Sequence, residues 1–307
     1  MPAVNIVRQK QINASPEKMH DILSDLGQWA AWSPWLISEP GVQVDVQPGG
    51  KAYSWKGSRV GEGNMQVTDS SQPGTIHYDL TFLKPWKSKA KVKMQIQPSE
   101  GGSLVSWSMD SKLPFFMFFM KKMMVAFVSS DYDRGLNLLK DYAEDGEIHS
   151  KLDFLGRNQY PGCNYVGIKR SCSFDEMPQL MKTDFTALMT ESMKVDNCRP
   201  LDAICIYHKW DMVKKTMSYT AGIPYDGATP QLASAQMSGS IPATSVYTLE
   251  HIGPYEHLGN AWSTLYGMVR SKEIRVKKSI HPFETYGNSP TNTDPHDLST
   301  KIHFPVR

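Results

Sequence analysis

This sequence lacks an excess of charge of either sign. The chain has 33 lysine and arginine residues against 31 aspartate and glutamate residues, so the formal net charge at pH 7 is only +2. Such a balance creates no strong field for an anionic partner. The composition therefore argues against nucleic acid or an anionic membrane as the main partner.

Cysteine is also scarce, and none of it is arranged as a metal or redox motif. The sequence has neither a CxxC pair nor the His-rich spacing of zinc sites. The N-terminus has no basic segment leading into an apolar run, so no secretory signal is predicted and we expect a cytoplasmic protein with reduced thiols, without metal or cofactor. The four cysteines are Cys163, Cys172, Cys198 and Cys205.

Long apolar runs are missing as well. The most apolar stretch, "LPFFMFFMKKMMVAFV" from Leu113 to Val128, is interrupted by Lys121 and Lys122. It stops short of the roughly 20 residues that a membrane-spanning helix needs. We therefore expect the buried start of a helix here, and no membrane partner.

What the first half does have is a succession of strands between two helices. An alternating strand from Val4 to Ile12 is followed by Ser15, a typical helix N-cap, with Pro16 at the first helical position. Five strand-like runs follow between residues 50 and 111, and three-and-four spacing of apolar residues then predicts a long helix over residues 120–142. This order predicts an α+β domain in which an antiparallel sheet wraps on a long C-terminal helix, a plan that can leave a cavity.

The stretches "INASPEKMHDILSDLGQWAAWSPW" and "SSDYDRGLNLLKDYAE" in this half resemble the START-like, polyketide-cyclase/lipid-transport (SRPBCC) superfamily. The resemblance implies a helix-grip fold over residues 1–146 with a second, apolar cavity. Strand alternation could turn His77, Asp79 and Asp110 toward that cavity, and the Met- and Phe-rich run at residues 115–127 would add an adaptable lining. Ordinary core packing explains the tryptophans of this half as well as a ligand cavity does; these are Trp29, Trp32, Trp35, Trp55, Trp86 and Trp107.

The second half contains an internal repeat. A shift of 81 positions aligns Phe174 with Tyr255 and Met181 with Trp262, without a gap. The alignment predicts two copies of a strand-helix-strand-strand unit, related by a pseudo-twofold axis, with a groove where they meet.

The stretches "HIGPYEHLGNAWSTLYGMV" and "HPFETYGNSPTNTDPHDLSTKIHFPVR" resemble the GyrI-like effector-binding family, the ligand-sensing module of many bacterial transcription activators. The resemblance implies a GyrI-like domain over residues 160–307, after a linker at residues 147–159. No helix-turn-helix pattern precedes it, so we expect no direct nucleic acid binding. Sequestration, detoxification or a response through a protein partner remain open.

Within this half, Glu284 is a carboxylate among apolar and aromatic residues. Strand alternation places Glu284 and Tyr286 on one face and Phe283 and Thr285 on the other. The resemblance implies that the glutamate meets the positive charge of an aromatic ligand, which agrees with the attraction between rings and cations. An exposed glutamate on an edge strand is the alternative. The candidate ligand-binding residues are Glu284, Tyr255, Trp262, Tyr286, Trp210 and Tyr219.

A hydrolase or cyclase acting on a reactive apolar molecule is the alternative function. Glu284 could act as a general base beside Tyr255 or Tyr286, and a buried base cannot be told from a buried counter-ion in one sequence. His281 and Glu284 form an H-x-x-E pattern, but on a strand this spacing sends the two side chains to opposite faces, so no metal site is predicted. The sequence thus favours a two-domain protein that binds small hydrophobic and cationic ligands.

Overall fold

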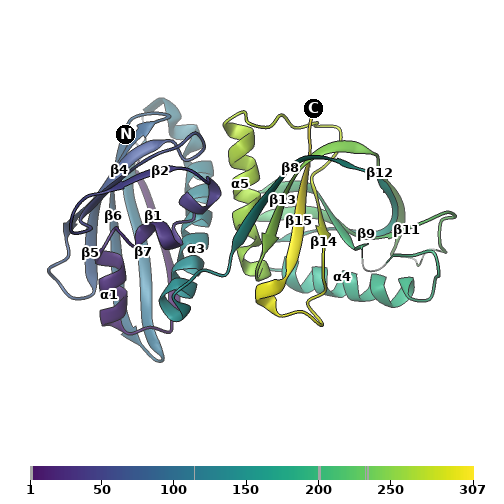
Figure 1. Ribbon diagram of the computed structural model, residues 1–307, viewed down its shortest axis with the longest axis horizontal. Helices are drawn as coiled ribbons and strands as arrows, with labels where there is room; N and C mark the ends of the chain where they lie inside the picture. Colours follow the sequence, from purple (N-terminus) through teal and green to yellow (C-terminus); the bar gives the residue numbers. More distant parts are fainter. Residues whose placement is uncertain (1–2, 114, 200–201, 232, 234) are drawn as a thin grey trace. The chain divides into compact units, whose positions relative to one another are not determined.

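The computed structural model describes residues 3–113, 115–199, 202–231, 233 and 235–307 (Figure 1). The chain divides into two compact units, the first ending at Ser150 and the second beginning at Lys151. Each unit has its own sheet and its own hydrophobic core.

The first unit is built on a seven-stranded sheet, antiparallel throughout, in the order β1-β7-β6-β5-β4-β3-β2 (Figure 1). Strands β3 to β7 correspond to the five predicted runs. The strands are β1 (Ala3–Ile12), β2 (Gln43–Val46), β3 (Ala52–Lys56), β4 (Glu62–Asp69), β5 (Thr75–Lys84), β6 (Ser88–Ser99) and β7 (Gly102–Lys112).

Helices cover one face of this sheet. The hydroxyl of Ser15 accepts a hydrogen bond from the backbone N–H of Lys18 at 3.2 Å, so it caps α1 as its sequence position predicts. Helix α3 packs against β1 and ends at Gly146 in the left-handed conformation. The predicted α+β plan is confirmed. The helices are α1 (Pro16–Ser24), α2 (Trp29–Trp32), α3 (Lys121–Asp145), and the short η1 (Leu36–Ser38) and η2 (Phe115–Met120).

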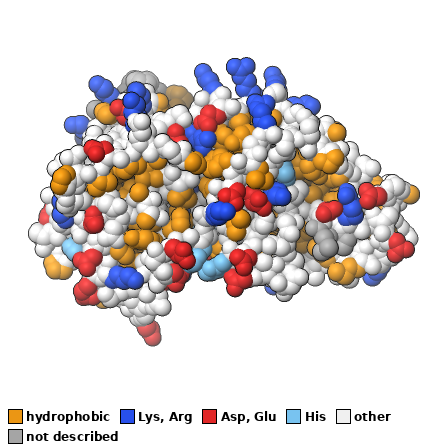
Figure 2. Space-filling model, viewed as in Figure 1, with side chains coloured by type: hydrophobic (Ala, Val, Ile, Leu, Met, Phe, Trp, Pro, Cys, Tyr) orange, Lys and Arg blue, Asp and Glu red, His pale blue; other side chains and the backbone are white. Residues whose placement is uncertain are grey.

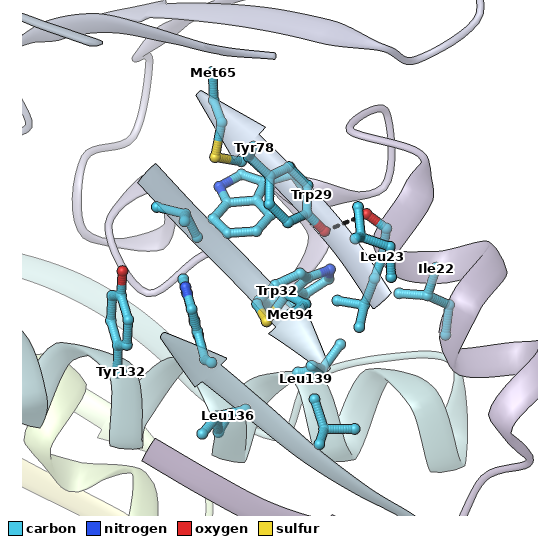
Figure 3. Packing of buried hydrophobic residues seen from close by; sticks show 14 of the residues in the cluster. Ile22, Leu23, Trp29, Trp32, Met65, Tyr78, Met94, Tyr132, Leu136 and Leu139 are labelled. Atoms are coloured by element: carbon cyan, nitrogen blue, oxygen red, sulfur yellow. Dashed lines mark hydrogen bonds between the residues drawn. The ribbon is translucent and has the colours of Figure 1, made fainter. Parts of the chain in front are cut away.

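Aromatic side chains form the centre of this unit's core (Figure 3). Trp107 on β7 stacks on Tyr132 of α3, with ring centroids 4.0 Å apart. Trp29 and Trp32 of α2 pack against the Trp107 ring in edge-to-face geometry. The hydroxyl of Tyr78 donates a 2.6 Å hydrogen bond to the carbonyl of Leu23, which ties β5 to α1. These contacts join helices and sheet directly.

The apolar run after β7 is less buried than its sequence predicts. Phe118 is 61% exposed and Phe119 is 70% exposed, and Met123 and Phe127 also reach solvent, while Pro114 lies outside the described residues. The expectation of a buried helix start is therefore wrong for these positions, because the side chains of Phe118 and Phe119 face solvent. Among the described residues, none of the helices combines the length and apolar character needed to cross a membrane.

The second unit repeats one motif twice in an eight-stranded sheet, in the order β12-β9-β11-β10-β14-β15-β13-β8. The predicted strand-helix-strand-strand repeats are β9-α4-β10-β11 and β13-α5-β14-β15. The elements are β8 (Lys151–Tyr160), β9 (Cys163–Ser173), α4 (Met177–Ser192), β10 (Ile204–Asp211), β11 (Thr216–Tyr225), β12 (Met237–Ile241), β13 (Thr244–Ile252), η4 (Tyr255–His257), α5 (Leu258–Arg270), β14 (Phe283–Tyr286), η5 (Pro295–Asp297) and β15 (Ser299–Pro305).

Each repeat also has a leading strand that joins the other repeat. Strand β8 precedes the first repeat but pairs with β13 of the second, and β12 precedes the second repeat but pairs with β9 of the first. Residues 151–159, most of the stretch 147–159 that was expected as a linker, thus belong to a strand of the second sheet. Leu152 and Phe154 of β8 pack against that unit's core, which explains why the segment is ordered.

Charged side chains of both signs are mixed on the visible face (Figure 2). Positive and negative side chains therefore lie near one another over most of this face, in agreement with the small net charge of the chain.

Candidate functional site

Glu284 lies on β14, next to the boundary between the two repeats. Its register partner on β10 is Cys205, and both side chains are completely buried. As strand alternation predicts, Tyr286 shares the face of Glu284, while Phe283 belongs to a core cluster on the other face. The alternative of an exposed glutamate is excluded, because Glu284 is 0% exposed.

Three aromatic side chains donate hydrogen bonds to this carboxylate. The indole N–H of Trp262 donates to Oε1 at 2.6 Å, and the hydroxyls of Tyr207 and Tyr286 donate to Oε2 at 2.8 and 2.9 Å. The donors come from α5, β10 and β14, so both repeats contribute. Both carboxylate oxygens have donors, which is the arrangement that a buried charge requires.

Burial and hydrogen bonding act in opposite directions on the acidity of this site. Burial raises the pKa of Glu284 above its ordinary value, and the bonds from Trp262, Tyr207 and Tyr286 lower it in part. Burial and the nearby carboxylate raise the pKa of the Tyr207 and Tyr286 hydroxyls, which remain proton donors.

More exposed rings surround this buried cluster. Tyr255 in η4 is 40% exposed, and its ring lies 6.2 Å from the ring of Tyr286. Gly253 has a φ of 138°, a conformation that favours glycine, in the turn that leads to Tyr255. From the other repeat, Phe185 of α4 meets the edge of Tyr286 at 5.6 Å. Partly exposed rings thus stand between the carboxylate and solvent.

The two remaining candidates lie farther from the carboxylate. Trp210 is exposed, and its ring lies 6.0 Å from that of Tyr207 and 4.8 Å from that of Phe174. Tyr219 is the register partner of Tyr207, but its buried hydroxyl donates to Asp184 at 2.8 Å. The structure joins Trp262 and Tyr286 to Glu284 directly, Tyr255 and Trp210 through ring contacts, and Tyr219 to a different acid.

That second acid, Asp184 of α4, is also completely buried, and sequence reasoning did not single it out. Arg170 of β9 forms an ion pair with it at 2.7 Å, so its charge is balanced within the protein. Its position within the apolar stripe of α4, between Met181 and Leu188, was the signal that could have found it.

Tyr207 was likewise missed. Cys205 and Tyr207 alternate onto one face of β10, but only the pairing of β10 with β14 brings that face to Glu284. No local sequence pattern predicts the pairing of β10 with β14, because the two strands are far apart in the chain.

The first unit contains a cavity of about 250 Å³. His77, Asp79 and Asp110 are not among its described lining residues; Ile76 and Tyr78 of β5 are buried, which turns His77 and Asp79 to the outer face, where Asp79 pairs with Lys91. The expectation for these three residues is therefore corrected. Of the Met- and Phe-rich run, Met124 lines the cavity. The tryptophans that line it are Trp29, Trp35, Trp55, Trp86 and Trp107.

Within the part of the chain that the structure describes, no group of three or more histidine, cysteine, aspartate or glutamate side chains could hold a metal ion. His281 is exposed, and its ring lies against His208 at 4.8 Å, whereas Glu284 is buried. The H-x-x-E pattern therefore does not form one site.

Comparison with known proteins agrees with this division. Residues 3–144 match the family described as polyketide cyclase / dehydrase and lipid transport. Residues 158–307 match the GyrI-like small molecule binding domain. Among curated proteins, none matches the chain.

Several solved structures are similar to parts of the chain at low sequence identity. A cryo-EM structure of the EcmrR-DNA complex has 18% identity and a TM-score of 0.43, covering 63% of this chain and 72% of that one. The EcmrR C-terminal domain has 19% identity and a TM-score of 0.42, covering 52% and 98%. SAV2435, solved with tetraphenylphosphonium, has 16% identity and a TM-score of 0.39, covering 50% and 94%. By its two family matches, the chain consists of a polyketide cyclase/lipid transport domain followed by a GyrI-like small molecule binding domain.

Proposed function

We propose that the second unit binds a hydrophobic cation, with Glu284 as its counter-charge. The observation that carries the proposal is a fully buried carboxylate whose three hydrogen-bond donors are all aromatic side chains. Among the described residues, no cation hydrogen-bonds to Glu284, whereas Asp184 has Arg170. The negative charge of Glu284 is solvated by neutral donors, and a bound cation would complete the pair.

The surrounding rings suit such a ligand. A ring attracts a cation to its face, and the attraction increases when water is excluded. Because Glu284 has no exposed surface, a cation meets Tyr255, Tyr286 or Trp262 first. The carboxylate then attracts the cation through these rings, or contacts it directly after one of the rings has changed its side-chain conformation.

The enzyme alternative has less support from this geometry. A general base must take a proton, and both oxygens of Glu284 already accept hydrogen bonds that stabilise the anion. Of the two tyrosines considered as partners in hydrolysis, Tyr286 donates to Oε2, whereas Tyr255 is not one of the three donors. We therefore favour binding, with sequestration, detoxification or sensing through a partner as its biological use.

Calorimetric titration with a matched pair of ligands tests the proposal. Tetraphenylphosphonium serves as the cation and triphenylphosphine oxide as a neutral comparator. Glu284→Gln should weaken cation binding by about 1.5–3 kcal/mol, the scale of an interaction with a charged group, and should affect the neutral compound far less. Glu256→Gln removes the same charge from an exposed position of η4 and should change neither. Equal cation affinity of the wild type and Glu284→Gln would refute the proposal.

A further inference from the structure

One end of the first unit exposes several large apolar side chains. In η2, Phe118 is 61% exposed and Phe119 is 70% exposed. Neighbouring exposed rings of this size are typical of a surface that meets a partner, because water solvates them poorly. The exposed set, which we call the apolar tip, is Trp86, Phe118, Phe119 and Met123.

The order of the strands brings the apolar tip together. Ala90 of β6 pairs with Ser111 of β7, so the start of β6 and the end of β7 lie side by side. The loop that carries Trp86 precedes β6, and η2 follows β7, so both leave the sheet at the same end. Trp86 also lines the cavity together with Lys112 and Met124, which places the start of α3 at this end too.

Lysines accompany the apolar tip, and acids are missing from the same segments. Residues 80–89 and 111–130 contain six lysines and neither aspartate nor glutamate. Lys84 pairs with Glu62 at 2.9 Å, and the other five form no ion pair with a described residue. The small net charge of the whole chain does not reveal this local excess. The six exposed lysines are Lys84, Lys87, Lys89, Lys112, Lys121 and Lys122.

The start of α3 departs from what stabilises a helix. The partial positive charge of a helix N-terminus favours acidic side chains, but the first turn of α3 contains Lys121 and Lys122 and no acid. Its N-cap residue, Met120, makes no side-chain capping hydrogen bond. Such local departures from stability are expected where a surface has a function outside the fold. Here they concentrate positive charge beside Phe118 and Phe119.

A negatively charged lipid surface suits this combination of rings and lysines. Aromatic side chains enter the boundary between headgroups and acyl chains, while lysines remain at the level of the phosphates. A second copy of the chain suits it less, because a twofold contact would place lysines opposite lysines. Single-stranded nucleic acid needs rings arranged for stacking, whereas the rings of Phe118 and Phe119 stand at 88° to each other.

We infer that the apolar tip and its lysines attach the protein reversibly to the surface of an anionic phospholipid bilayer. The attachment is peripheral, with Phe118 and Phe119 entering the boundary region. The sequence-based expectation of no membrane partner rested on net charge and on the length of the apolar run, and neither quantity measures a local cluster. The inference goes beyond small-molecule binding and does not depend on Glu284.

Co-sedimentation of the full chain with lipid vesicles tests the inference. Vesicles of phosphatidylcholine and phosphatidylserine at about 3:1 provide the anionic surface, and phosphatidylcholine alone is the neutral comparator. Binding to the anionic vesicles should be roughly tenfold stronger or more. It should weaken steeply between about 0.1 M and 1 M salt, because the screening length falls from about 10 Å to about 3 Å.

Three results with the wild type would overturn the inference. They are no binding to anionic vesicles, equal binding to both kinds of vesicle, and capture by a single-stranded oligonucleotide without capture by vesicles. The last result would assign the lysines to nucleic acid instead.

Two double variants separate the contributions of rings and charges. Phe118→Ser with Phe119→Ser should weaken binding to anionic vesicles roughly tenfold or more, because the rings no longer bury apolar area in the bilayer. Lys121→Gln with Lys122→Gln should also weaken it roughly tenfold or more, because each lysine near an anionic surface contributes about fivefold. All four side chains are exposed, so thermal unfolding should stay close to that of the wild type.

Matched controls show whether the position of these residues matters. Lys214→Gln with Lys215→Gln removes the same charge from the exposed turn between β10 and β11. Val7→Ser removes an apolar side chain of β1 that is 54% exposed. Both controls should bind anionic vesicles as the wild type does. If they weaken binding as much as the variants of the apolar tip, the inference fails.

Quenching by brominated phospholipids provides a second readout that needs no change at Phe118 or Phe119. Bromine in the acyl chains quenches tryptophans at the bilayer, so quenching of the bound protein should decrease in Trp86→Phe. Trp210→Phe is the control, because that exposed indole lies in the second unit and its loss should leave quenching unchanged. Equal quenching in Trp86→Phe and the wild type would contradict attachment through the apolar tip. Glu284→Gln should bind vesicles normally, so failure of the cation proposal and failure of this one give different results.

Discussion

Ile204 on β10 and Thr285 on β14 face each other in the sheet, and they are also equivalent positions of the two repeats, 81 residues apart. The pseudo-twofold axis of the second unit therefore passes through this pair. Glu284 lies one residue away, and its equivalent in the first repeat is Ala203. The two repeats are related by symmetry, but only the second repeat carries an acid at this position. The negative charge of the site therefore belongs to the second repeat.

Trp262→Phe should destabilise the protein through this acid. The substitution keeps a ring but removes the donor of the 2.6 Å bond to Oε1, leaving a buried carboxylate oxygen without its partner. The free energy of unfolding, measured by denaturant titration, should fall by about 1–3 kcal/mol. Trp210→Phe is the control, because that indole is exposed and should change stability by no more than about 0.5 kcal/mol.

The same substitution should cost less in a Glu284→Gln background. A neutral amide loses less than a carboxylate when a donor is removed, so the two changes should not be additive. Additive effects in this double-mutant cycle would show that Trp262 acts through packing alone.

The second unit should lose stability in mild acid. Burial lowers the pKa of His208, His251 and His303 from 6.5 to about 4. Between these values the unfolded chain binds protons that the folded chain does not, so the free energy of unfolding falls as the pH drops. The slope is at most about 1.4 kcal/mol per pH unit for each histidine.

Glu284 should oppose this trend. Because its pKa is raised in the folded state, it contributes stability at low pH that is lost as the pH rises through that value. Glu284→Gln should therefore make the acid-side loss steeper than in the wild type. Thermal unfolding of both proteins between pH 7 and pH 4 checks the sign, and a loss that is no steeper in the variant would contradict it.

The position of β8 leads to a prediction about where the chain can be divided. A fragment of residues 151–307 should unfold cooperatively, as should a fragment of residues 1–150, because each has its own sheet and core. A fragment that begins at residue 161 lacks β8 and exposes the edge of β13, so it should be markedly less stable. Calorimetry of the three fragments distinguishes these outcomes. Equal stability of the two C-terminal fragments would show that β8 is dispensable.

A panel of ester and strained-ring compounds tests the enzyme alternative. We expect saturable binding without product, because both oxygens of Glu284 already accept hydrogen bonds from Trp262, Tyr207 and Tyr286. Product that accumulates with the wild type and disappears with Glu284→Gln would assign catalysis to this acid instead.

In this protein the sequence predicts local features, such as which side chains share a strand face, better than it predicts which distant strands pair. The two-residue period of strands correctly placed Glu284 and Tyr286 on one face, and the 81-residue repeat correctly predicted the repeated motif. Tyr207 could not be found, because it meets Glu284 only through a pairing of distant strands. His77 was expected at the wrong face although Ile76 and Tyr78 were the better guide, since apolar neighbours decide which half of a strand faces the core.

The exchange of leading strands bears on how such a domain could arise by duplication. Half of the second unit, β8 through β11, would have an unpaired β9 edge, and its own first strand would have no partner. Two separate half-length chains would satisfy both edges by trading those strands, as domain-swapped dimers do. Fusion of two such chains end to end would give the present topology directly, and subsequent divergence of one half could then introduce a carboxylate where the other retained alanine.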